Sequence, residues 1–94
     1  MTTPTPIVLQ LYVIGSTPAS ARAIVNTRRM CDEQLPGRCT LEVIDIRERP
    51  QAAAEADLIA APTLVKVLPA PLRRFIGDMS RTASIVAELA ATPG

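Results

Sequence analysis

The chain has 94 residues, 48% of them hydrophobic, and its formal net charge at pH 7 is +1. This length suits one domain with one modest core, and the core must be aliphatic because Tyr12 and Phe75 are the only aromatic residues. The near-neutral charge gives no support for nucleic-acid or membrane binding, and no apolar run is long enough to span a bilayer.

Two cysteines and the absence of histidine restrict the chemistry. Cys31 and Cys39 have neither CxxC nor metal-ligand spacing, so we interpret them as small buried thiols. Segment 1–6 has no basic residue, which predicts no secretory signal and a cytoplasmic protein with reduced thiols. Without histidine the chain lacks the commonest acid–base residue and metal ligand, and we expect no metal site and no cofactor.

The first half of the chain predicts a strand, a helix and a second strand. Residues 7–14 are almost continuously apolar and branched, which is typical of a central strand buried on both faces. After a short loop, Thr17-Pro18 begins a helix that extends to about Leu35, where Pro36-Gly37 ends it. Residues 40–46 alternate and predict a less buried strand. The expected apolar stripe of the helix consists of Ala21, Ile24, Cys31 and Leu35.

The second half predicts a short helix, two strands and a last helix. Residues 50–59 form the helix, residues 63–68 and 72–76 the strands, and Ser80 is expected to cap the last helix. The order βαβαββα is that of the α/β thioredoxin-like fold, a mixed four-stranded sheet with helices on both faces. We therefore expect one domain over residues 1–94, with residues 1–6 and 91–94 frayed.

Prolines border both strands of the second half. Because proline fixes φ and lacks an N–H donor, Pro62, Pro69 and Pro71 are expected to set strand register and to act as conformational residues. Thioredoxin-like proteins carry a cis-proline at the start of the third strand. This position is occupied here by Pro62, so we expect the Ala61–Pro62 bond to be cis.

Four segments stand in order along the chain with little room for insertions. They are Leu11-Tyr12-Val13-Ile14-Gly15-Ser16-Thr17-Pro18-Ala19-Ser20-Ala21-Arg22-Ala23, Leu41-Glu42-Val43-Ile44-Asp45-Ile46-Arg47-Glu48-Arg49-Pro50-Gln51, Ala61-Pro62-Thr63-Leu64 and Arg73-Arg74-Phe75-Ile76-Gly77-Asp78-Met79-Ser80. This ordered set resembles the KaiB family, the small clock-associated partner proteins of the KaiC ATPases. The resemblance covers roughly positions 7 to 90, nearly the whole chain.

The resemblance implies two candidate states. Family members adopt a tetrameric ground-state fold, in which the second half has a different secondary structure, and a thioredoxin-like state that binds KaiC. The strand pattern of residues 63–68 favours the thioredoxin-like state, which we expect as a monomer, with the KaiB ground-state fold and its tetramer as the alternative. Gly77 and Asp78 match the family's segment after the last strand and join the expected conformational residues.

The resemblance also implies a partner-binding surface. The family's basic residues match at Arg22, Lys66, Arg73 and Arg74, which we expect to form a cationic patch on the first helix and the predicted hairpin. Asp45 and Asp78 also match family positions, and the sequence leaves open whether they are docking carboxylates or local caps.

The expected function is that of a non-enzymatic adaptor. In this interpretation the chain docks on a KaiC-like ATPase and modulates phosphorylation, timing or stress signalling. The segment Ser16-Thr17-Pro18-Ala19 occupies the loop where thioredoxin-like redox enzymes carry CxxC, so no thiolate forms there. We expect no catalytic residue. The alternatives are a thioredoxin-like enzyme with an atypical site and a sensor module that partners a histidine kinase.

Overall fold

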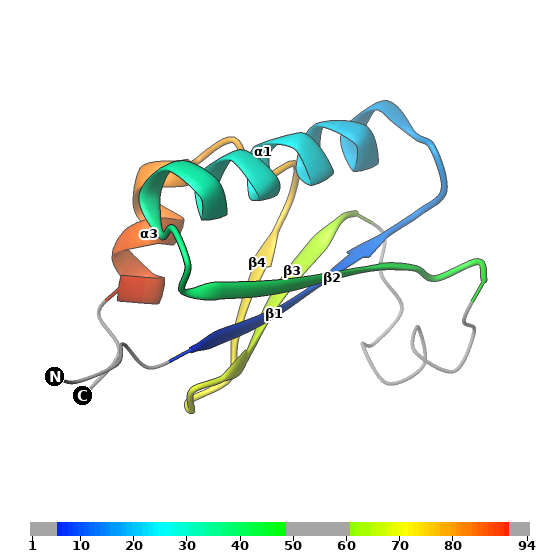
Figure 1. Ribbon diagram of the computed structural model, residues 1–94. Helices are drawn as coiled ribbons and strands as arrows, with labels where there is room; N and C mark the ends of the chain where they lie inside the picture. Colours follow the sequence, from blue (N-terminus) through cyan, green and yellow to red (C-terminus); the bar gives the residue numbers. More distant parts are fainter. Residues whose placement is uncertain (1–5, 49–60, 91–94) are drawn as a thin grey trace, which may run out of the picture.

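The computed structural model describes residues 6–48 and 61–90, in which two helices lie on the same side of a four-stranded sheet (Figure 1). Strand order is β2-β1-β3-β4, with β1 parallel to β2 and antiparallel to β3, and β3 antiparallel to β4. The elements in chain order are β1 (Ile7–Val13), α1 (Pro18–Gln34), β2 (Cys39–Asp45), β3 (Thr63–Leu68), β4 (Arg73–Ile76) and α3 (Thr82–Ala90).

The observed order and mixed sheet confirm the predicted thioredoxin-like α/β fold. All four predicted strands are present, and β3 spans the predicted residues 63–68. The helix predicted for residues 50–59 lies outside the described residues, as do the ends expected to fray at 1–5 and 91–94. Neither described helix is both long and apolar enough to cross a membrane.

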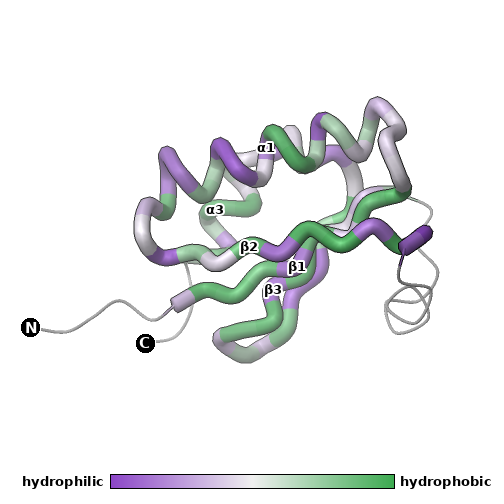
Figure 2. The backbone as a smooth tube through the Cα atoms, turned by 45° about the vertical axis from the view of Figure 1, so that its right-hand side comes forward, coloured by the Kyte–Doolittle hydropathy of each residue, from purple (hydrophilic) through white to green (hydrophobic). Residues whose placement is uncertain are grey.

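The main core lies between the sheet and the two helices. β1 directs Ile7, Leu9 and Leu11 towards the helices, and each of these side chains is fully buried. A smaller cluster on the other face joins Tyr12 of the same strand to Ile44 and Val65. β1 is thus buried on both faces, as its continuous apolar sequence predicts, and Figure 2 shows it as a largely hydrophobic strand between its neighbours.

Helix α1 begins at the predicted cap and turns an unexpected face to the sheet. The side chain of Thr17 accepts a hydrogen bond from the Ser20 amide, and Pro18 occupies the first turn. The buried residues of α1 are Ser20, Ala23, Thr27, Met30 and Cys31. The predicted stripe is therefore wrong at its first position, because Ala21 is exposed. The buried face of α1 instead includes the hydroxyl-bearing side chains of Ser20 and Thr27.

The cis-proline prediction is wrong. Among the described residues the cis peptide bonds are Leu68–Pro69 and Ala70–Pro71, not Ala61–Pro62. Cis prolines are typical of tight turns, and the tight turn in this part of the chain is the β3–β4 connection. Pro62 instead leads into β3, and its carbonyl accepts a hydrogen bond of 2.8 Å from the Gly77 amide.

Candidate docking surface

The loop between β4 and α3 is tied to the first helix by Asp78. The Arg22 guanidinium pairs with the Asp78 carboxylate at 3.2 Å (Nε to Oδ2), and the Asn26 side-chain amide donates to the Asp78 carbonyl at 2.9 Å. The Ser80 amide donates to Oδ1 of Asp78 at 3.0 Å. Hydrogen bonds from Ser80, and after them the Arg22 guanidinium, hold the pKa of Asp78 below its ordinary value of 3.8. In this fold Asp78 is therefore a local cap that joins two segments far apart in sequence.

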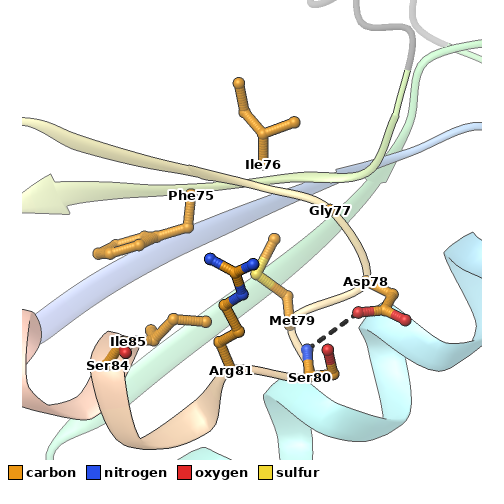
Figure 3. Close-up of a pocket in the computed structure, with 9 residues that line it drawn as sticks. All are labelled: Phe75, Ile76, Gly77, Asp78, Met79, Ser80, Arg81, Ser84 and Ile85. Atoms are coloured by element: carbon orange, nitrogen blue, oxygen red, sulfur yellow. Dashed lines mark hydrogen bonds between the residues drawn. The ribbon is translucent and has the colours of Figure 1, made fainter.

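A hollow of about 590 Å³ lies beside this loop (Figure 3). Phe75 and Ile85 supply apolar walls, and Arg81 supplies a positive charge. The hollow is lined by Phe75, Ile76, Gly77, Asp78, Met79, Ser80, Arg81, Ser84 and Ile85. Gly77 and Met79 both have positive φ, of 122° and 63°. This bent loop brings polar and apolar groups to one opening next to the edge strand β4.

The arginines of β4 point to opposite faces of the sheet. Arg73 pairs in register with Lys66 on the helix side, and its Nε lies 3.9 Å from a Glu88 carboxylate oxygen of α3. Arg74 pairs with Val65 on the other face, which it shares with Ile76, two residues on. Ile76 is 77% exposed, the most exposed large hydrophobic side chain among the described residues. β4 thus presents exposed charge on both faces and an exposed apolar side chain on one.

Lys66 does not belong to this surface. Its side chain is only 2% exposed, so the prediction that it lies on a basic patch with the two arginines is wrong. The reason is the period of the strand: Lys66 follows Leu64 by two residues and therefore points to the same helix-covered face of the inner strand β3. Of the expected cationic residues, Arg22, Arg73 and Arg74 remain exposed and belong to two different elements.

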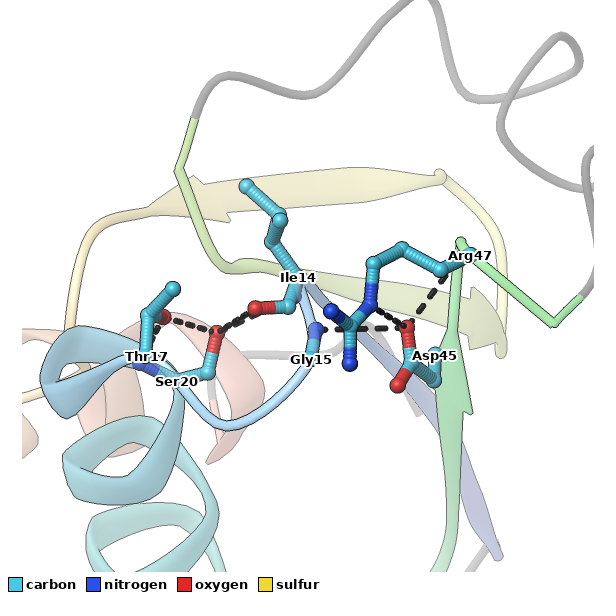
Figure 4. Close-up of polar contacts among 6 residues, drawn as sticks. All are labelled: Ile14, Gly15, Thr17, Ser20, Asp45 and Arg47. Atoms are coloured by element: carbon cyan, nitrogen blue, oxygen red, sulfur yellow. Dashed lines mark hydrogen bonds and ion pairs between the residues drawn. The ribbon is translucent and has the colours of Figure 1, made fainter.

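Two sets of polar contacts, one around Ser20 and one around Asp45, hold the loop between β1 and α1 (Figure 4). The buried Ser20 hydroxyl accepts hydrogen bonds from the Ile14 amide at 3.0 Å and the Thr17 hydroxyl at 2.8 Å. Asp45, at the end of β2, accepts hydrogen bonds from the Arg47 and Gly15 amides at 3.0 and 3.2 Å. Its pKa is held below 3.8 mainly by the Arg47 amide, with the Gly15 amide and the Arg47 charge adding to the effect.

These contacts answer two questions that the sequence left open. Asp45 is a local cap in this fold, because both of its hydrogen-bonded amides come from the ends of β1 and β2. Thr17 is engaged in capping, and the loop has no thiol at the place where redox enzymes carry CxxC. Among the described residues, no group of three or more His, Cys, Asp or Glu side chains is placed to hold a metal ion.

Comparisons with known proteins agree with this fold and sequence. The family model described as KaiB domain matches residues 10–90. The circadian clock protein KaiB3 of Synechocystis is 45% identical over 87 residues, which cover 93% of this chain and 85% of that protein. The circadian clock oscillator protein KaiB of Microcystis aeruginosa is 48% identical over 73 residues, which cover 78% of this chain and 70% of that protein.

Solved structures resemble the chain in fold. The N-terminal domain of Synechococcus elongatus SasA superposes with a TM-score of 0.71 at 22% identity, covering 100% of this chain and 92% of that domain. A thioredoxin of Fasciola hepatica superposes with a TM-score of 0.73 at 15% identity, covering 89% of this chain and 81% of that protein. Identities this low show the shared thioredoxin-like fold alone. By its sequence, over most of its length, the chain belongs to the KaiB family.

Proposed function

We propose that the chain is a non-enzymatic adaptor that docks on a KaiC-like hexameric ATPase and modulates its phosphorylation, in timing or stress signalling. The observation that carries this proposal is the match of residues 10–90 to the KaiB domain. The exposed arginines Arg22, Arg73 and Arg74 add charged positions at which a partner can dock. The relatives reported above bear the names of circadian clock proteins.

The loop before α1 supports a role without catalysis. A thioredoxin-like enzyme needs a low-pKa thiol at the start of this helix, and the segment Ser16-Thr17-Pro18-Ala19 contains none. The hydroxyls of Thr17, within this segment, and of Ser20, directly after it, make hydrogen bonds at the helix cap. A serine nucleophile would need a base, and the chain has no histidine. An insulin-reduction assay tests the enzymatic alternative, and we expect no turnover.

The edge strand β4 supports docking by charge and shape. Among the described strands β4 lies at an edge of the sheet, the position at which a partner strand can be added, and it carries Arg73 and Arg74 on its two faces. Ile76, beside Arg74, provides an apolar contact of the kind that becomes buried at the centre of an interface. The complementary surface on the ATPase would be acidic around an apolar patch. Charges arranged in this way govern association rate and specificity more than affinity itself.

The test is binding of the ATPase to wild type and to two charge-reversed variants. We expect Arg73→Glu with Arg74→Glu to weaken binding at least about tenfold at low salt, an effect of about 1.4 kcal/mol. Arg28→Glu with Arg29→Glu is the matched control, since it reverses two exposed charges on α1 and changes net charge equally. Biolayer interferometry with ATP present measures the dissociation constant, and circular dichroism confirms folding.

Two results would contradict the proposal. If both variants weaken binding equally, the effect reflects total charge, and β4 is not the docking element. If wild type does not bind the ATPase at all, the same assay with a histidine kinase tests the alternative partner.

A further inference from the structure

The two cysteines lie on different elements but line one pocket. Cys31 is in the last turn of α1, and Cys39 is the first residue of β2. Both side chains line a pocket of about 210 Å³ together with Arg28, Asp32 and Leu41. Both thiols are free, with Cys31 buried and Cys39 partly exposed. The fold therefore brings together two reduced sulfurs that an eight-residue spacing in the sequence does not connect.

Burial makes the two sulfurs unequal. It is the main cause that raises the pKa of Cys31 to about 12, and the neighbouring Cys39 sulfur raises it further. Burial also raises the pKa of Cys39, which is the more exposed of the two. Cys39 is thus the sulfur that a small disulfide in solution reaches more easily.

Arg38 directly precedes Cys39 in the sequence. Its positive charge opposes the effect of burial on the Cys39 thiol, whose pKa stays above its ordinary value. Nε of Arg38 is buried and has no hydrogen-bond partner within residues 6–48 and 61–90. Arg38 therefore favours the thiolate of Cys39 by its charge and not by a hydrogen bond.

We propose that Cys31 and Cys39 form a redox-active dithiol, which a low-molecular-weight disulfide such as oxidised glutathione converts into an intramolecular disulfide between α1 and β2. The pair has the asymmetry that such a reaction uses. Cys39 is the more accessible sulfur, and it acts as the attacking thiol. Cys31 is buried next to it and acts as the resolving thiol.

The reaction balances as two exchanges. The Cys39 thiolate attacks one sulfur of oxidised glutathione, which forms a mixed disulfide and releases one glutathione thiolate. Cys31 then loses its proton and attacks the Cys39 sulfur, which forms the protein disulfide and releases the second glutathione thiolate. Two protein thiols are oxidised, one glutathione disulfide is reduced, and the two protons pass to the released thiolates.

The test uses the full chain in glutathione buffers of graded oxidation, quenched with acid and measured by intact mass spectrometry. We expect wild type to lose the mass of two hydrogen atoms, and peptide mapping to locate a bond between Cys31 and Cys39. The rate should rise about tenfold per pH unit below the pKa of Cys39, because only the thiolate attacks. A chain that stays reduced in excess oxidised glutathione, or that stops at a glutathione adduct, would overturn the proposal.

Single variants test the roles of the two sulfurs. Cys31→Ser should trap a glutathione adduct on Cys39, whereas Cys39→Ser should leave Cys31 unmodified. Equal modification of the two variants would overturn the assigned roles. Arg38→Gln should slow oxidation several-fold, and Arg29→Gln, an exposed arginine of α1 outside the pocket, should not. If a variant does not fold, the mass and mapping of wild type still decide whether the disulfide forms.

Discussion

Two hydroxyls on one face of α1 give a direct test of the described packing. Ser20 and Thr27 are seven residues apart, both are fully buried, and they differ in their hydrogen bonds. The Ser20 hydroxyl accepts from the Ile14 amide and the Thr17 hydroxyl, whereas Oγ1 of Thr27 has no partner among the described residues. Removing the first hydroxyl should therefore destabilise the fold, and removing the second should stabilise it.

The magnitudes follow from these partners. Ser20→Ala leaves the Ile14 amide without its acceptor, at a cost of about 1 to 2 kcal/mol, of which the higher helix propensity of alanine offsets up to about 0.5. Thr27→Val replaces an unsatisfied hydroxyl by a methyl group of similar size, with nearly equal helix propensity. Avoiding the desolvation of that hydroxyl should add about 1 kcal/mol to the free energy of unfolding. Each kcal/mol corresponds to a shift of about 4 to 8 °C in Tm.

Urea unfolding with a shared m-value measures both changes, and thermal unfolding checks their sign. Val25→Thr is the control, since it introduces a hydroxyl at a half-exposed position of the same helix and should change stability by less than about 0.5 kcal/mol. A neutral or destabilising Thr27→Val would refute the reasoning. It would indicate that the hydroxyl donates to the carbonyl one turn earlier in the helix.

Three further changes test other parts of the structure. Lys66→Met should raise the free energy of unfolding by about 1 kcal/mol, because the residue is only 2% exposed and methionine fills its place without a charged group. A loss of stability in urea would contradict this. The folded-state pKa values of Asp45 and Asp78 are lowered, so their stabilising contributions are complete above about pH 5 and lost as the pH falls through those values. Asp45→Asn with Asp78→Asn should flatten the decline in Tm below about pH 4, and an unchanged profile would assign the acid sensitivity to other groups. Gly15→Ala should lower the free energy of unfolding by about 1 to 2 kcal/mol, since φ is +57° and a Cβ would overlap the Arg47 guanidinium. Gly37→Ala is the control for φ alone, because a Cβ at Gly37 would meet open space. Equal losses of stability in the two variants would show that the exposed Arg47 side chain moves aside.

Local patterns predicted the fold because its elements follow local rules. The alternation in residues 63–68 and the run of branched residues in 7–14 each gave a strand, and Thr17-Pro18 gave the start of a helix. The same alternation predicts the position of Lys66: it follows Leu64 by two residues, so both side chains point to the same face of the sheet. The prediction of an exposed lysine rested on its charge instead, and charge does not determine which face a strand residue occupies.

Other features depend on contacts that no local pattern contains. The inward face of α1 differs from the predicted stripe because a stripe of apolar residues alone leaves out the small buried side chains of Ser20, Ala23 and Thr27. The pair of cysteines shares a pocket only because α1 runs back along the sheet to the start of β2. The cis bonds lie at Pro69 and Pro71, in the connection between β3 and β4, and not at Pro62.

Helix α1 contributes residues to both the proposed docking surface and the proposed dithiol, and these residues lie near its opposite ends. Arg22, near its start, holds the β4–α3 loop through Asp78, and Cys31, in its last turn, lines the dithiol pocket. Nine residues of helix separate these positions, about 14 Å, which exceeds the distance of about 10 Å over which surface charges act at moderate salt. Disulfide formation between two neutral thiols also leaves the net charge unchanged. Any change in docking on oxidation must therefore come from movement of α1 and not from a direct electrostatic effect.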